Sequence, residues 1–524
     1  MASTANLRSR RSAAQLHALA GVEREIRVQD SHNRRKYLRE FNQAFRNYES
    51  VLDSGQLHSA LTSADIVLVG DYHALPAAQR QAATLIEQRA MVGDRPVILG
   101  VETIFSRDQH ILDEWWRREI DEEELRQRIR FDLDWGYDWA PFYELLVMAR
   151  DHAEALYGLD CMPRENLRKI GARDRHAAIK IAEIREQHPN AVIFVLFGES
   201  HLAPGHLPHV VQEQMPEVKV LTVLQNVDAL YWRAAGERAD KVEAVRVNDS
   251  VLCLFNATPL EKYESYRLFL DQWSRCEDVP DFAPTIYNLI DSLASFLEIN
   301  RYSPHNTTQP KFLIDMLPEV YGGPSDGMLH RLLARKGISE QDRESALQGV
   351  ESRGSAYIPQ VNAFYVREFQ MAHVAEDVAR FLHHACQGLP QRINGHTGIF
   401  PDANCVKSSD RFQISVIENA VAYFGSRVLY PSRPAPESVN VPQLSRSACD
   451  KAAQIAADSD AARFESMARE WGYRIGQEIY SAYLSGKVLP SSIRRLCLIH
   501  LNEPGIARKV CATVIAKLRT IARG

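Results

Sequence analysis

Two short motifs each place a histidine three positions after a glycine. The first is GDYH (70–73) and the second is GESH (198–201), and in both an acidic residue follows the glycine directly. Neutral imidazole is a common metal ligand and a common general base near neutral pH. His73 and His201 could therefore form a metal site or an acid–base site, provided that the fold brings them together.

Carboxylates stand where they could complete such a site. Glu102 directly follows the apolar run 96–101, and Asp160 ends another apolar run. Asp71 and Glu199, inside the two motifs, could coordinate a metal or fix the tautomer of an imidazole. An acidic residue in such a position often only caps the next helix. The repetition of the motif favours a functional site.

Short apolar segments rich in β-branched residues alternate with helical patterns between residues 64 and 232. The apolar segments are 64–70, 96–102, 155–160, 191–198 and 218–224. Runs of this kind suit strands covered on both faces, and the alternation implies a doubly wound parallel sheet. Ligands of such folds collect beyond the carboxyl ends of the strands. We therefore predict an α/β domain whose sheet edge gathers His73, Glu102 and His201, with Arg173 and Asp174 at the start of a nearby helix.

The remaining chain is mostly helical in pattern. The predicted parts are an amphipathic helical lead-in at 1–54, the α/β domain at 55–258, a helical domain at 259–429, a Pro/Ser-rich linker at 430–442 and a C-terminal helical part at 443–524. Within the helical pattern 365–386, His373 and Glu376 lie three positions apart. Carboxylate bundles use the opposite order, Glu-x-x-His, on paired helices. We interpret these residues as a polar stripe that is solvated or bonded between helices.

Composition excludes several classes of protein. A chain of 524 residues predicts two or three domains, and a net charge of −5 gives no reason to expect nucleic-acid binding. The 8 cysteines are scattered without a CxxC motif, which predicts reduced thiols and a cytoplasmic location. We find no secretory signal and no apolar run of about 18 residues that would span a membrane. A homo-oligomer is compatible with the sequence.

Residues from about 55 to 240 resemble the ChaN-like haem-binding uptake domain, part of the wider Tiki/TraB and erythromycin-esterase-like superfamily. The resemblance is carried by GDYH (70–73), Glu102 in LGVE, WAPFYELL (139–146), RDRHAA (173–178) and GESHLAPGHLP (198–208). It implies that His73, His201 and Glu102 match the hydrolytic residues of Tiki-like and esterase-like relatives. The ChaN-like branch instead implies binding of haem iron. Asp71 stands where a glutamate commonly follows the first glycine, and its shorter side chain reaches less far.

Three hypotheses follow from the residues and the resemblance. The first is a hydrolase of an unidentified small-molecule or peptide ester or amide, using His73, Glu102 and His201 with or without a bound Mn, Zn or Co ion. The second is a haem- or metal-binding protein without turnover. The third is an interaction scaffold derived from an enzyme. The expected cofactor-binding residues are Asp71, Tyr72, Glu199, Asp160 and Arg173, with Tyr72 a conceivable ligand of haem iron.

Overall fold

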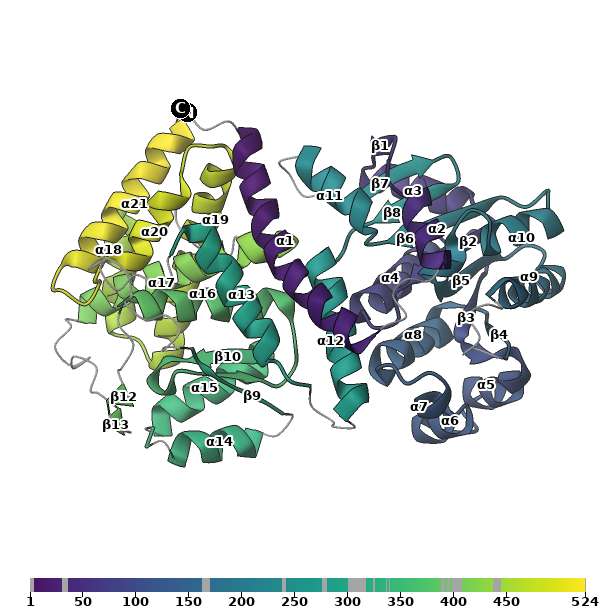
Figure 1. The fold of residues 1–524 in the computed structure, drawn as a ribbon, viewed down its shortest axis with the longest axis horizontal. Helices are drawn as coiled ribbons and strands as arrows, with labels where there is room; N and C mark the ends of the chain where they lie inside the picture. The colour runs from purple at the N-terminus through teal and green to yellow at the C-terminus, as the bar shows by residue number, and fades with distance from the viewer. Residues whose placement is uncertain are drawn as a thin grey trace. The chain divides into compact units, whose positions relative to one another are not determined.

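The chain forms two compact units in a computed structural model (Figure 1). One unit comprises Glu25–Leu270, and the other combines Met1–Arg24 with Asp271–Gly524. The structure describes residues 4–30, 36–162, 170–237, 242–275, 280–299, 317–323, 326–335, 337–338, 340–387, 392–393, 396–397, 408–436 and 444–523.

An eight-stranded sheet is the centre of the unit Glu25–Leu270, which we call the α/β unit. Its order is β1-β7-β8-β6-β2-β5-β3-β4. Strand β7 runs antiparallel to both of its neighbours, and the other pairs are parallel. The strands are β1 (Ser50–Val51), β2 (Ile66–Asp71), β3 (Val97–Phe105), β4 (Ala155–Asp160), β5 (Val192–Gly198), β6 (Val220–Gln225), β7 (Ala244–Asn248) and β8 (Val251–Leu254). The predicted parallel-sheet α/β fold is confirmed.

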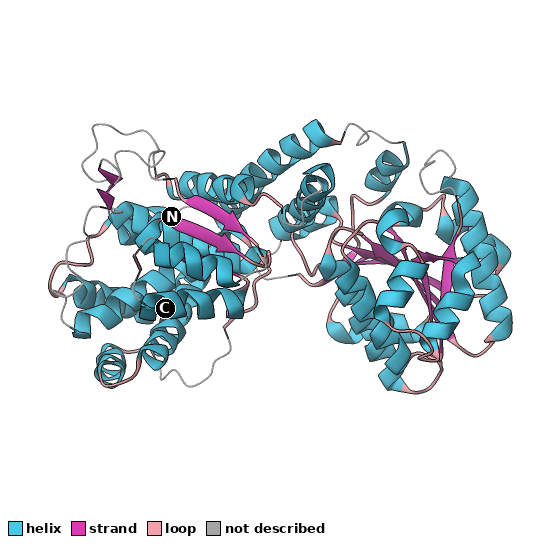
Figure 2. Ribbon diagram, turned by 90° about the horizontal axis from the view of Figure 1, so that it is seen from below, coloured by secondary structure: helices cyan, strands magenta, loops and turns pink. Residues whose placement is uncertain are grey.

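Helices cover both faces of this sheet, as Figure 2 shows. The side chains of β5 alternate between two apolar cores: Phe194 packs into one and Val195 into the other. The first core is lined by α3 (Ser54–Ser63), α4 (Pro76–Val92), α5 (Gln109–Trp116), α6 (Glu122–Arg128), α7 (Phe131–Asp134) and α8 (Trp139–His152). The second is lined by α2 (Lys36–Ala44), α9 (Ile170–Gln187), α10 (Leu207–Gln214) and α11 (Asp228–Glu237). Burial on both faces explains why the strands are apolar without interruption.

The register of the central strands positions the two histidine motifs. Strands β2 and β5 are parallel neighbours, and Asp71 lies opposite Gly198. Strand β3 pairs with the other side of β5, with Val101 opposite Leu196. The residues that follow β2 and β5 therefore leave the sheet side by side, next to Glu102 of β3.

Three strands of the sheet were not predicted. The lead-in predicted at 1–54 contains α1 (Thr4–Gln29) and α2 but ends in the short strand β1, which pairs with β7. Strands β7 and β8 form a hairpin between the last predicted strand and the helix α12 (Pro259–Arg275). Each has five residues or fewer, and a short run gives little periodicity to recognise.

The second unit is mainly helical, but part of it corrects the prediction. The domain predicted as helical at 259–429 also contains a three-stranded sheet of β10 (Ser355–Ile358), β11 (Ala363–Val366) and β9 (Glu319–Gly322). These strands have four residues each, too few to distinguish from a buried turn of helix by pattern. The helices are α13 (Ala283–Leu297), α14 (Asp326–Arg335), α15 (Glu340–Arg353), α16 (Met371–Gln387), α17 (Ser408–Leu429), α18 (Arg446–Ala457), α19 (Ala461–Leu484), α20 (Pro490–Leu498) and α21 (Ile506–Arg523).

Two further predictions concern the parts around these helices. Residues 437–442 of the linker predicted at 430–442 lie outside the described residues, and in its described part Tyr430 and Arg433 are buried. In the described part of the chain, no helix combines the length and the apolar composition that a membrane crossing requires.

Glu376 of α16 is the centre of a buried ion cluster rather than a metal site. Its carboxylate accepts hydrogen bonds from Tyr473 at 2.8 and 2.7 Å and pairs with Arg380 at 2.6 Å and Arg433 at 2.7 Å. Although burial raises the pKa of Glu376, the surrounding arginines hold it well below the ordinary value. The polar stripe on this helix is therefore bonded between elements, one of the two predicted alternatives.

Candidate functional site

His73 is a partly exposed imidazole at the end of β2 whose orientation is set by a carboxylate. Its Nδ1 lies 2.7 Å from Oδ2 of Asp71, and Gln79 of α4 donates to the other oxygen of Asp71. With Nδ1 as the donor, the lone pair is on Nε2. That nitrogen makes no hydrogen bond to a described residue, and it lies 3.8 Å from Oε2 of Glu102. The side chain is 22% exposed, against 4% for that of His201, so His73 is the more accessible of the two imidazoles.

His201 is held in a similar way but is closed off. Its Nδ1 lies 2.5 Å from Oδ1 of Asp174, at the start of α9, and the second oxygen of Asp174 holds His206 at 2.9 Å. The Nε2 of His201 lies 3.7 Å from Glu102 and 3.4 Å from Nη1 of Arg173. The side chain of His201 is only 4% exposed, so Nε2 faces the guanidinium of Arg173 rather than solvent.

Glu102 joins the two histidines from within β3, directly after the last residue of that strand that pairs with β5; the strand continues to Phe105 and does not end before Glu102 as the apolar run predicted. One of its oxygens accepts a 2.5 Å hydrogen bond from the backbone N of Gly198, and the other accepts from Arg173. A Cβ on Gly198 would lie 3.1 Å from Glu102 Oε2 and 3.2 Å from His73 Nε2. The glycine of the second motif is thus needed for close approach to the first motif, not for a positive φ.

Arg173 is the buried cation of the site. It donates to Asp160 through Nε at 2.8 Å and through Nη2 at 3.0 Å, and it also donates to Glu102. Burial raises the pKa of Glu102, but Arg173 and the two histidines outweigh this and lower the pKa to about 2. Burial has the opposite effect on His73 and lowers its pKa, but Asp71 and Glu102 hold that pKa above its ordinary value. Glu102 is therefore ionised throughout the neutral range.

The guanidinium of Arg173 conflicts with the predicted divalent-metal site. A metal held by His73, Glu102 and His201 needs the carboxylate and both Nε2 atoms free to coordinate it at about 2 Å. Here Arg173 already binds Glu102 and lies beside His201. Within the described residues, no group of three or more His, Cys, Asp or Glu side chains is arranged to hold a metal. The donor set does not fit a divalent cation.

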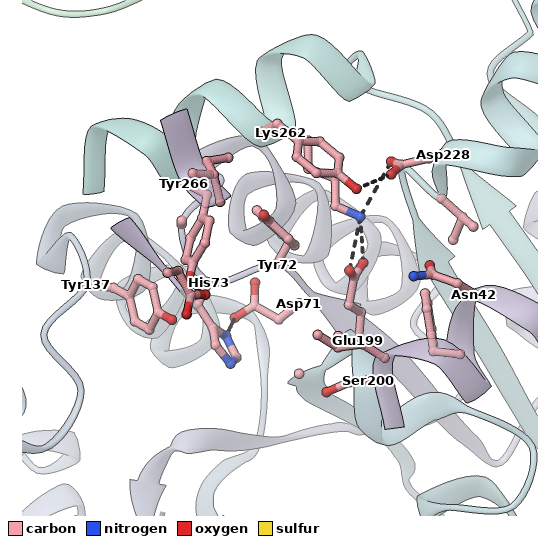
Figure 3. A pocket seen from close by; sticks show the side chains of 18 of the residues that line it. Asn42, Asp71, Tyr72, His73, Tyr137, Glu199, Ser200, Asp228, Lys262 and Tyr266 are labelled. Carbon is pink, nitrogen blue, oxygen red and sulfur yellow. Dashed lines mark hydrogen bonds and ion pairs between the residues drawn. The ribbon is translucent and has the colours of Figure 1, made fainter. Parts of the chain in front are cut away.

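A cavity of about 260 Å³ opens beside His73 (Figure 3). Its wall includes Tyr137, whose ring centre is 5.3 Å from that of His73. At the opposite side, Lys262 of α12 lies 3.0 Å from both oxygens of Glu199 and 4.6 Å from the centre of the Tyr72 ring. Burial lowers the pKa of Lys262, but Glu199 raises it overall, so this amine stays protonated. Figure 3 shows Glu199 pointing toward Lys262 and Asp71 toward His73.

The predicted site residues thus fall into two groups. His73, Glu102, His201, Asp71, Asp160 and Arg173 form one connected network. Glu199 and Tyr72 lie with Lys262 at another wall of the cavity. Burial, together with nearby carboxylates, raises the pKa of Tyr72 well above its ordinary value.

The part that Lys262 plays was not predicted from the sequence, and Asp174 was given no role beyond its place near Arg173. Lys262 stands in the ordinary helical sequence PLEKYESY (259–266), and its partner Glu199 is 63 positions away. No local pattern marks such a lysine. Asp174 could have been found, because it stands next to Arg173 in the segment RDRHAA (173–178).

Comparison with known proteins supports the resemblance for part of the chain. Residues 57–188 match the family model described as haem-binding uptake, Tiki superfamily, ChaN. This ChaN-like segment contains His73, Glu102 and Arg173 and ends before His201. A solved structure titled "Cofacial heme binding to ChaN of Campylobacter jejuni" is similar at 14% identity and a TM-score of 0.26, covering 33% of this chain and 86% of that one. No curated protein matches the chain.

Proposed function

We propose that the α/β unit binds haem and that Nε2 of His73 is the nitrogen ligand of the iron. The observation that carries the proposal is the state of this nitrogen. Asp71 fixes the ring through Nδ1, and Nε2 has no hydrogen-bond partner among the described residues and lies on a cavity-lining side chain. A carboxylate behind a ligating histidine fixes its tautomer and raises its basicity. The description of the family that matches residues 57–188 gives independent support.

The two histidines are not equivalent in this proposal. His201 is buried and its Nε2 faces Arg173, so it serves to hold the network together. Bound haem would supply an iron centre, and this chain would supply one imidazole, its carboxylate support and the cavity wall.

Titration with haemin tests the proposal. We expect the full-length chain to give a Soret band of nitrogen-ligated haem, and His73→Ala to lose it. A matched control is His209→Ala, because His209 is an exposed histidine of α10 that does not line the cavity. Asp71→Asn should weaken binding by about 10–100-fold, the usual effect of removing the support of a ligating histidine. An unchanged Soret band in His73→Ala, with normal folding, would exclude His73 as the ligand.

A second candidate is metal-independent hydrolysis of a small ester or amide. The size of the cavity favours it, because about 260 Å³ lies below the usual range of roughly 300–1,000 Å³ for ligand pockets. Neutral His73 would take a proton from water through Nε2, and Asp71 would stabilise the resulting imidazolium. Glu102, fixed by Arg173 and Gly198, would orient the ring and the water.

The pH dependence of hydrolysis tests this second candidate. His73 acts as a base only when neutral, and its pKa is raised by Asp71 and Glu102 despite burial. We therefore expect kcat/KM on a panel of p-nitrophenyl esters to rise with pH and to level off above pH 6.5. Asp71→Asn should move the midpoint to lower pH. A flat profile, or equal rates in His73→Ala and His209→Ala, would count against hydrolysis and leave haem binding untouched.

A further inference from the structure

Two cysteines of the second unit are in contact although they are distant in the sequence. The Sγ atoms of Cys449 and Cys511 lie 3.7 Å apart, with 62 positions between them in the chain. Cys449 belongs to α18 and Cys511 to α21, and the two residues are 3% and 2% exposed. The scattered cysteines predicted reduced thiols, and the packing of these two helices brings two of them together as a buried pair.

We propose that Cys449 and Cys511 are a redox site that forms a reversible disulfide and fastens α21 to α18. The bond length of a disulfide is about 2.0 Å, so the sulfur atoms must approach by about 1.7 Å. The two cysteines are on separate helices joined through α19 and α20. A small sliding of one helix or a change of side-chain rotamer can supply this movement.

Oxidation begins when the thiolate of one of the two cysteines attacks an oxidant small enough to enter the helical core, such as hydrogen peroxide. Either thiol can be the donor in the contact between them, and both are buried, so the geometry gives neither cysteine priority. The attacking sulfur forms an S–O bond, the O–O bond of the peroxide breaks, and the departing hydroxide takes up the proton of that thiol to become water.

The other cysteine then completes the exchange. Its sulfur attacks the sulfur of the sulfenic acid, an S–S bond forms, and the S–O bond breaks. The hydroxide that leaves takes up the proton of the second thiol and becomes a second water. In total, two thiols are oxidised to one disulfide while one peroxide is reduced to two waters. A thiol reductant reverses the step by thiol–disulfide exchange.

The disulfide should stabilise the C-terminal helices. It closes a loop that contains α19 and α20, and closing a loop of this length restricts the unfolded chain. We expect the melting temperature of the second unit to rise by roughly 5–10 °C on oxidation and to return on reduction.

Peptide mapping of the full-length chain tests the proposal. After treatment of the reduced protein with hydrogen peroxide, we expect two thiols per chain to disappear and a disulfide-linked peptide pair containing Cys449 and Cys511 to appear. Cys449→Ser should show neither the loss of two thiols nor the linked peptides. The control Cys253→Ser, which removes a buried cysteine of the α/β unit, should show both. A cross-link between other cysteines, or oxidation of Cys449 without a cross-link, would overturn the proposal. The peptide map of the wild-type chain is the decisive measurement, so the result does not depend on whether a variant folds.

Discussion

Replacing Arg173 with methionine should lower the free energy of unfolding of the α/β unit by about 3–5 kcal/mol. Arg173 is 6% exposed and is the buried cation between Glu102 and Asp160. Its removal leaves two buried carboxylates without their positive partner. Loss of one member of a buried ion cluster is costly because the remaining charges are neither solvated nor paired.

Urea unfolding measures this effect, with amide exchange of β2 and β5 reporting on the α/β unit itself. The matched control is Arg126→Met, since Arg126 is 43% exposed and pairs with Asp132 on the surface. A surface pair of this kind contributes less than about 1 kcal/mol. Arg173→Lys should lie between the two variants, because lysine keeps the charge but cannot reproduce the forked contacts. Equal destabilisation by Arg173→Met and Arg126→Met would show that Arg173 is not the centre of the network.

Acid should destabilise the second unit less when His383 is replaced with leucine. His383 of α16 is 1% exposed, and neither ring nitrogen has a hydrogen-bond partner in the described part of the chain. Burial lowers its pKa from 6.5 to about 3. Between these two pH values His383 is protonated in the unfolded chain and neutral in the folded chain. The stability that neutral His383 permits above pH 6.5 is therefore lost as the pH falls toward 3.

The expected size of the effect follows from the same linkage. A pH of 5 lies about 1.5 units below the ordinary pKa of a histidine in the unfolded chain. Protonation of this histidine then stabilises the unfolded state by roughly 2 kcal/mol. The fall in unfolding free energy between pH 8 and pH 5 should be smaller by that amount in His383→Leu than in the wild type. The control His330→Leu changes an exposed histidine of α14. If both variants lose stability in acid as the wild type does, His383 is not the acid-sensitive group.

The site shows how far a repeated motif can be interpreted. The two motifs look alike in sequence, yet their histidines have different surroundings. His73 lines a cavity and its Nε2 makes no hydrogen bond to a described residue, whereas His201 is buried against Arg173. Metal ligation by both was a reasonable prediction from residue types alone. The position of the guanidinium is what makes the set unsuitable for a divalent cation.

The sequence by itself determined the α/β fold and the edge at which the site lies. Runs such as 191–198 are apolar at every position because both faces of the strand are covered, and that pattern is local. The polar residues that end these strands mark the carboxyl edge, so the nearness of His73, Glu102 and His201 followed from the topology. The short strands β7, β9, β10 and β11 were missed because five residues or fewer carry too little pattern.

Only the tertiary structure decided which partners these residues have. Lys262 pairs with Glu199, Arg173 joins Glu102 to Asp160, and Cys449 touches Cys511. Arg173 and Asp160 are 13 positions apart, and the other pairs are separated by 62 to 71 positions. The energy of a charge or a thiol depends on what surrounds it after folding, and spacing along the chain does not contain that information.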